Sequence, residues 1–250
     1  MSSILKVNTI QDQDGNNIIN ESSDTITIGA SGDTVNVVGT LQNNGGSVGI
    51  TSKEGGTNFT NSLLVGTDST GTLDAATGNT GVGVGVFAAL TSGDNNIAVG
   101  LNSLAALTTG TENTAVGKEA MCSNTTASNN TALGSGALKT NSTGSGNTAI
   151  GAYSLDASTT SNHNTGVGQN TLTANTTGYA NTAVGYNALC THTTGNSNTA
   201  VGDNTMRLTT TGTFNVAVGD NALCANTTAS ENVAVGRDAL FANTTGADNV

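Results

Sequence analysis

The sequence repeats with a period of 17 residues through most of its length. One glycine and one asparagine return at fixed places in every period, and no insertion interrupts them. The glycines are Gly83, Gly100, Gly117, Gly134, Gly151, Gly168, Gly185, Gly202, Gly219 and Gly236, and the asparagines are Asn79, Asn96, Asn113, Asn130, Asn147, Asn164, Asn181, Asn198, Asn215, Asn232 and Asn249. One such short unit cannot bury its apolar face alone, so the period predicts a protein in which units stack on one another.

Each column of the repeat indicates one environment, and residues 181–197 are the best-formed copy. The residue before the glycine, Val184 in this copy, is Val, Ile or Leu in every copy, and we expect it to be buried. The residue four places after the glycine, Leu189 here, is Leu, Met or Phe and predicts a second buried column. The residue two places before the glycine, Ala183 here, is only Ala or Gly, which indicates a close contact. The residue after Leu189 varies widely between copies, so we expect solvent there.

This spacing favours β-structure over helix. A helix needs apolar residues at i, i+3, i+4 and i+7, and a Gly with β-branched residues in every unit weakens it further. We expect two short strands joined by a tight turn, with the recurring Gly at positive φ or in close backbone contact, and a second turn at Thr-Thr-Gly. Units stacked about 4.8 Å apart would align the asparagines into an amide ladder. The prediction is an all-β parallel β-solenoid, or β-roll, of 17-residue rungs; its interior is narrow, so we expect a homotrimer whose chains share the Ala/Gly face.

The repeat divides the chain into three segments. Residues 79–250 form the repeat shaft, and residues 41–78 form a transitional segment with imperfect rungs, in which Val65-Gly66 and Val48-Gly49 fall one and two periods before Val82-Gly83. Residues 1–40 contain short alternating runs at 25–28 and 34–38, which predict a separate small β element.

Composition excludes several classes of protein. Charged residues make up 9% and aromatic residues 3%, so the chain cannot build a broad core of large side chains. Disorder is disfavoured because that state goes with high charge or proline, and the chain has no proline. The net charge of −11, without a basic stripe, excludes nucleic acid as a partner. Because no apolar run is long enough for a membrane span and the first residues lack a secretory signal, we expect synthesis in a cytoplasm.

The residue types that usually form catalytic or metal sites are not grouped. Cys122, Cys190 and Cys224 share one column, with neighbours 68 and 34 residues apart, which is too far along a stack for a disulfide and predicts free thiols that are at the surface or half-buried. His163 and His192 fall in different columns without a Cys or acid cluster, so we expect both in solvent-facing loops and predict no metal site.

Repeated polar residues raise the question of two further functions, a glycosidase and an ice-binding protein. Asp203 and Asp220 stack in one column, but the same column carries Tyr186 and Arg237 and no cleft surrounds it, so we predict no glycosidase and no enzyme of another kind. No unit carries the Gly-rich calcium motif of other β-rolls, and no cofactor is expected. Thr or Ser pairs such as 193–194 raise the question of an ice-binding solenoid, but adjacent residues point to opposite faces, so a turn is the better interpretation.

Two families share these patterns. The unit Asn-Thr-Ala-Val-Gly-x-x-Ala-Leu, as at 181–189, resembles the head repeats of trimeric autotransporter adhesins, which are trimeric left-handed β-rolls. The opening Ser-Ile-Leu-Lys-Val-Asn-Thr-Ile-Gln at 3–11, with Asp-Gly-Asn at 14–16, looks like tail-fibre and virion structural proteins of marine bacteriophages. The adhesin repeats are shorter, and adhesins carry a signal peptide and a membrane anchor that this sequence does not show.

These resemblances imply a structural role in a virion. We expect the shaft of a phage tail fibre, with residues 1–40 docking on a tail or adaptor protein. Because the repeat reaches Asn249-Val250 inside a unit, we expect the host receptor to be bound by parts beyond residue 250. The alternatives are a bacterial trimeric adhesin head and an ice-binding β-solenoid.

Overall fold

The computed structural model describes residues 42–43, 46–47, 52–54, 59–66 and 70–250, so the β element predicted within residues 1–40 lies outside the described residues. The chain forms two units, Met1–Gly49 and Ile50–Val250. In the first, strands β1 (Gln42–Asn43) and β2 (Gly46–Ser47) pair as an antiparallel hairpin.

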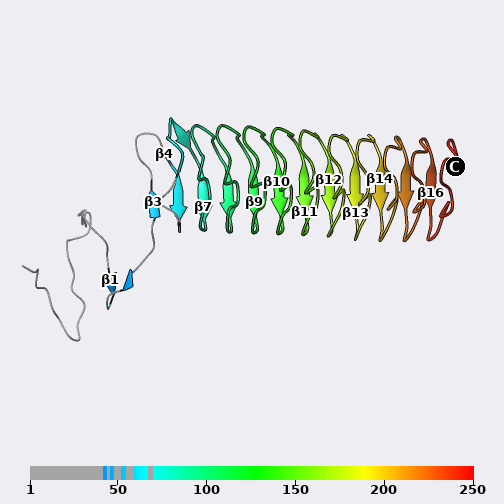
Figure 1. Ribbon diagram of the computed structural model, residues 1–250, viewed down its shortest axis with the longest axis horizontal. Helices are drawn as coiled ribbons and strands as arrows, with labels where there is room; N and C mark the ends of the chain where they lie inside the picture. Colours follow the sequence, from blue (N-terminus) through cyan, green and yellow to red (C-terminus); the bar gives the residue numbers. More distant parts are fainter. Residues whose placement is uncertain (1–41, 44–45, 48–51, 55–58, 67–69) are drawn as a thin grey trace, which may run out of the picture. The chain divides into compact units, whose positions relative to one another are not determined.

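The second unit is a parallel β-solenoid (Figure 1). Its main sheet contains, in spatial order, β16 (Val233–Val235), β15 (Val216–Val218), β14 (Thr199–Val201), β13 (Thr182–Val184), β12 (Thr165–Val167), β11 (Thr148–Ile150), β10 (Thr131–Leu133), β9 (Thr114–Val116), β8 (Ile97–Val99), β7 (Thr80–Val82), β5 (Leu63–Val65) and β3 (Ser52–Glu54). A smaller parallel pair joins β4 (Phe59–Thr60) to β6 (Ala76–Thr77). The described residues contain no helix, and the predicted all-β solenoid with 17-residue rungs is confirmed.

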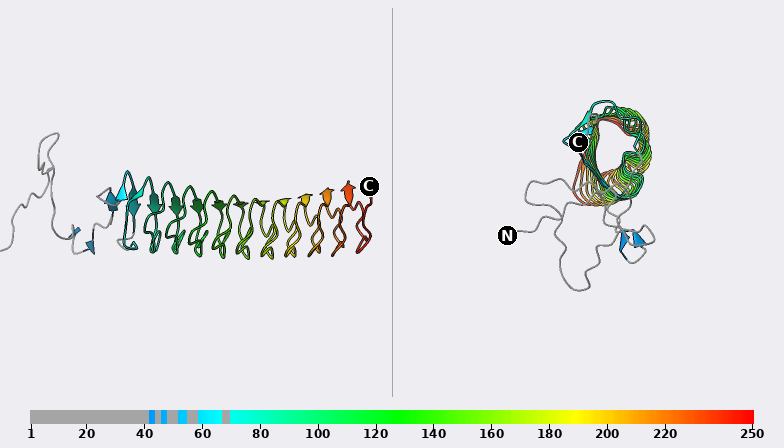
Figure 2. Two further views of the ribbon diagram at one scale, coloured as in Figure 1. Left: turned by 90° about the horizontal axis from the view of Figure 1, so that it is seen from above. Right: turned by 90° about the vertical axis from the view of Figure 1, so that its left-hand side faces the viewer.

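The strands pair in a single register, which is why the period admits no insertion. Thr182, Ala183 and Val184 of β13 face the residues 17 places later in β14. Viewed along the stack, the rungs overlie one another as a closed oval (Figure 2). The first rung begins at β5, whose Leu63 pairs with Thr80, so Val65-Gly66 lies in a rung of the stack. Beyond β5 the neighbour is β3, which runs antiparallel; Val48-Gly49 lies outside the described residues.

The orientation of the strands corrects the prediction for the Val column. Each three-residue strand points its middle residue inward and its outer two residues outward, as alternation requires. The middle Ala183 is fully buried, whereas Val82 and Leu133, from the column expected to be buried, are 41% and 48% exposed. The β-branched residues before the glycines therefore form the outer surface of the sheet.

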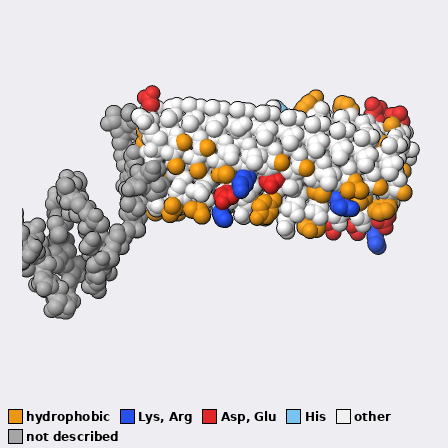
Figure 3. Space-filling model, in the orientation of Figure 1, with side chains coloured by type: hydrophobic (Ala, Val, Ile, Leu, Met, Phe, Trp, Pro, Cys, Tyr) orange, Lys and Arg blue, Asp and Glu red, His pale blue; other side chains and the backbone are white. Residues whose placement is uncertain are grey.

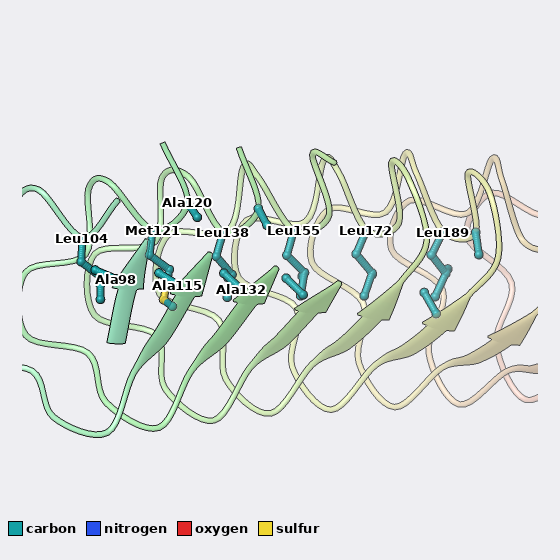
Figure 4. Packing of buried hydrophobic residues seen from close by; sticks show 14 of the residues in the cluster. Ala98, Leu104, Ala115, Ala120, Met121, Ala132, Leu138, Leu155, Leu172 and Leu189 are labelled. Carbon is teal, nitrogen blue, oxygen red and sulfur yellow. The ribbon is translucent and has the colours of Figure 1, made fainter. Parts of the chain in front are cut away.

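The interior shows why the inward strand residue is small. The Leu column is buried as predicted, and Leu104, Met121, Leu138, Leu155, Leu172 and Leu189 lie in a row inside the coil, with Ala98, Ala115 and Ala132 beside them (Figure 4). At Gly81 an added Cβ would collide with the side chain of Leu64 in the neighbouring rung and would lie 2.9 Å from the side chain of Val86 in the turn of the same rung. The close contact is therefore within one chain, and the expectation that several chains share the Ala/Gly face is wrong.

Each rung forms one strand and not the predicted two. The Leu column lies in a turn, and all ten of its residues have positive φ, for example 51° at Leu189. This region is disfavoured for a bulky residue by about 1–2 kcal/mol. The stack opposes that cost, because Leu189 N donates to the carbonyl of Thr205 in the next rung at 3.1 Å.

The recurring glycines meet both conditions predicted for them. Gly100 has φ +123°, and an added Cβ would lie 2.6 Å from the carbonyl oxygen of Gly117. Only a residue without a side chain allows both the backbone conformation and this distance between rungs.

Candidate functional surfaces

A ladder of buried asparagines runs through the stack, as the repeat predicted. The Oδ1 of Asn181 accepts from the backbone N and the Nδ2 of Asn198, both at 3.0 Å. Its Nδ2 donates to Oδ1 of Asn164 at 3.2 Å and to the carbonyl of Gly195 at 3.0 Å. Both polar atoms of the buried amide are thus satisfied, and the ladder is a structural element rather than a ligand site.

A second inward column of polar residues supports the turn that follows the Leu column. Asn141 accepts from the backbone N of Gly144 at 3.1 Å and donates to its carbonyl at 2.8 Å. His192 occupies the same column and its Nε2 lies 2.7 Å from the carbonyl oxygen of Gly195, so the ring replaces the asparagine amide. His192 is completely buried, which corrects the expectation of a solvent-facing loop; His163 is exposed as expected.

His192 is a titratable group that is buried inside the coil, and burial shifts its pKa. Desolvation lowers the pKa of His192 below its ordinary value, and the nearby backbone carbonyls of Gly195 and Thr209 oppose that shift. Its Nδ1 has no hydrogen-bond partner, and neither has the Oδ1 of Asn175 one rung earlier in the same column. The column therefore contains two buried polar atoms on adjacent rungs without a partner, one of them on the His192 ring.

The threonine and serine column is used in stacking. The hydroxyl of Thr193 donates to the carbonyl of Thr210 at 3.1 Å, and the hydroxyls of Thr108 and Thr210 do the same toward the next rung. These bonds join neighbouring rungs at the Thr-Thr-Gly bend, in agreement with the predicted turn.

In the part of the chain that the structure describes, neither the cysteines nor the carboxylates are grouped into a reactive centre. The three cysteines are free thiols, of which Cys224 is buried and the other two are partly exposed. Within residues 70–250, no three metal-binding side chains are grouped. Asp203 and Asp220 are both exposed, and Asp220 pairs with Arg237 at 3.7 Å.

Among the described residues the ion pairs form two small groups, one around Glu119 and one around Arg237. Lys139 lies 2.8 Å from Glu119, and this contact lowers the pKa of Glu119 and raises that of Lys139. Lys118 approaches the same carboxylate at 3.8 Å. These ion pairs are exposed to solvent, and such pairs contribute little to stability.

The outward surface of the main sheet, which we call the strand face, is the largest regular feature of the exterior. It is formed by the first and third residues of β5 and β7–β16. The first residue is Leu, Thr, Ile or Val, and the third is Val, Leu or Ile. In Figure 3, hydrophobic side chains recur along the solenoid, while charged side chains gather in small groups. The strand face carries no charged residue in these eleven strands.

Exposed aromatic side chains lie at both edges of the strand face, and this grouping was not predicted from the sequence. Tyr153 and Tyr186 lie in the turn that follows the strand, whereas Tyr179 and Phe214 lie in the turn that precedes it. All four are about half exposed, between 47% and 60%. The available signal was that the chain has three tyrosines and that all three fall within residues 153–186.

Comparison with known proteins leaves the family open. No family model, no curated protein and no solved structure matches the chain. No helix among the described residues has the length and apolar character needed to cross a bilayer.

Proposed function

We propose that this chain is the shaft of a phage tail fibre, attached to the virion by its N-terminal segment and holding receptor-binding parts away from the particle. The observation that carries the proposal is the unbroken stack, in which strand pairing, the asparagine ladder and the threonine hydroxyls all join each rung to the next. Three sets of hydrogen bonds along one axis resist bending, and a shaft needs that property.

The shaft assembles as a homotrimer through the strand face. The side chains of the strand face recur once per rung, so only a surface with the same spacing can match them along the whole length. A second copy of the chain, aligned in parallel, has such a surface. Val184 and Val201 from adjacent rungs would then pack on the same residues of the neighbouring protomers. Closed threefold symmetry removes the face from water in all three chains.

Sedimentation tests this assembly. Placing a lysine at Val184 puts a charge into the proposed interface, and we expect trimers to dissociate. Placing a lysine at Thr194, which is exposed in a turn away from the strand face, is the control and should leave the trimer unchanged. A wild-type chain that sediments as a monomer would contradict assembly through this face.

Electron microscopy of particles tests the role. Deleting two whole rungs, residues 147–180, keeps the register and should shorten an attached fibre by about 10 Å. Deleting residues 1–40 should give particles without the fibre. Fibres that remain attached after the second deletion would contradict attachment through the N-terminal segment.

One observation favours a second candidate, an ice-binding solenoid. The strand face places Thr182 and Val184 side by side, and the pattern returns at every rung from β9 to β14 with little change. Regular files of hydroxyl and methyl groups on a stiff sheet are suited to ordering water. Thermal hysteresis that is abolished by a lysine at Thr182, in a chain that sediments as a monomer, would favour this candidate over the shaft.

A further inference from the structure

One stretch of the solenoid differs from the rest in charge. Residues 157–202 contain no Lys, Arg, Asp or Glu, whereas the rungs on either side carry the two groups of ion pairs. All three tyrosines of the chain lie in or next to this stretch, and each is about half exposed. A repeat scaffold offers the same surface at every rung, so a local change of chemistry marks a local site.

The turn after the strand arranges two of these rings beside a row of amides. Tyr153, Asn170, Asn187 and Asn204 occupy one column on successive rungs, and Tyr186 lies in the adjacent column. The amides are ordered, because Nδ2 of Asn170 donates to Oδ1 of Asn187 at 3.2 Å, and Nδ2 of Asn187 donates to Oδ1 of Asn204 at 3.3 Å. We call these five residues the tyrosine strip.

The ring of Tyr153 lies against the backbone. The residue before it in the same column is Gly136, which is buried, and an added Cβ at Gly136 would lie 2.9 Å from the Tyr153 ring. Asparagine is the commonest residue in this column, so the glycine makes room for the ring. With one face on the backbone and 47% of the residue exposed, the ring is held in place before any ligand binds.

We propose that the tyrosine strip binds a neutral saccharide chain that lies along the solenoid axis. The two rings are two rungs apart, about 10 Å along the axis, and each offers an apolar surface on which the C–H groups of a sugar ring can stack. An asparagine amide has two N–H groups and two lone pairs, and the amide ladder uses only part of them, so donors and acceptors remain for sugar hydroxyls. Residues 157–202 contain no Lys or Arg side chain, and the exposed carboxylate of Asp203 borders the strip beside Asn204, which favours a neutral ligand over nucleic acid or an acidic polymer.

This inference goes beyond the proposed function and does not depend on it, because a saccharide can bind to the strip whether or not the chain is part of a virion. The strip lies at the edge of the strand face and not on it, so trimer assembly and saccharide binding use different residues.

Affinity electrophoresis of the full chain tests the proposal, with dextran, a soluble mannan and a soluble galactan as neutral probes and polygalacturonate as the acidic comparison. The column neighbours supply substitutions that the fold already tolerates: Tyr153→Asn, as at Asn170, and Tyr186→Gln, as at Gln169. The matched control is Tyr179→Asn, as at Asn196, because Tyr179 is an equally exposed tyrosine at the other edge of the strand face.

We expect at least one neutral polysaccharide to retard the wild-type chain, and each strip variant to bind it about tenfold more weakly, with unchanged circular dichroism. The Tyr179→Asn variant should bind like the wild type. The proposal is overturned if none of the three neutral probes retards the chain, if only polygalacturonate does, if the double strip variant keeps wild-type affinity, or if Tyr179→Asn loses as much affinity as the strip variants.

Discussion

Replacing Asn181 with alanine tests the asparagine ladder where it has neighbours on both sides. The side chain is fully buried and makes four hydrogen bonds, two through Oδ1 to Asn198 and two through Nδ2 to Asn164 and Gly195. The substitution removes all four without changing the backbone register, because the backbone N of Asn181 still donates to Oδ1 of Asn164 at 2.9 Å.

The loss of stability depends on whether each of the four atoms bonded to the Asn181 side chain keeps another hydrogen bond in the variant. The backbone N of Asn198 loses the acceptor it had in Oδ1 of Asn181, and an unsatisfied buried donor costs about 1–3 kcal/mol. The other three partner atoms each keep a second hydrogen bond. The carbonyl of Gly195 still contacts His192, Oδ1 of Asn164 still accepts from the backbone N of residue 181, and Nδ2 of Asn198 still donates to Gly212. Each of these three losses therefore costs about 1 kcal/mol. We expect Asn181→Ala to lower the free energy of unfolding by about 4–6 kcal/mol.

Urea unfolding followed by far-ultraviolet circular dichroism measures this change. Asn162→Ala is the matched control, because Asn162 is a partly exposed asparagine whose side chain accepts from Ser145 N at 2.8 Å and donates weakly to Thr160 at 3.3 Å. Its loss should be about 1 kcal/mol or less. If Asn181→Ala is no more destabilising than Asn162→Ala, the ladder does not hold the rungs together.

Three further predictions use other parts of the coil. Ala183→Leu should destabilise the folded chain by at least about 1–3 kcal/mol in urea, because the residue faces the interior and not a second chain. Gly100→Ala should also lower the urea midpoint, through its φ of +123° and the nearby carbonyl of the next rung. Stability should fall as the pH drops below 6.5, because the folded chain resists protonation of His192 and the unfolded chain does not; His192→Asn should reduce this fall in pH-dependent melting, whereas His163→Asn should not.

Much of the fold could be predicted from the sequence, because an uninterrupted period of 17 residues implies that equivalent residues stack on one another in neighbouring rungs. The rung length, the parallel pairing, the buried leucines, the asparagine ladder and the special glycines all follow from columns that tolerate few residue types. These features depend only on contacts between equivalent residues of neighbouring rungs, and those contacts are readable without knowing the path of the chain.

The path within one rung could not be read in the same way. Because side chains alternate along a strand, Thr182 and Val184 must point to one face of the sheet and Ala183 to the other. This alternation does not show which of the two faces is inside the coil. Size was misleading: the interior is narrow and accepts alanine, while valine stays outside. The positive φ of Leu189 could not be predicted from the residue type, because this backbone conformation is usually adopted by Gly or Asn and not by Leu. His192 could have been placed inside from its column, which holds asparagines in several other rungs.

The contacts that give this coil its stiffness reach only from one rung to the next, and this has a consequence for how its gene can change. A duplication or loss of 17 codons adds or removes one complete rung and leaves every remaining pair of rungs in register. Recombination between similar units can therefore alter the reach of the protein in single steps, without any compensating substitution. Such events would also carry the tyrosine-bearing rungs nearer to the N-terminal segment or farther from it, so that the position of a binding surface and the length of its support vary together among descendants of one gene.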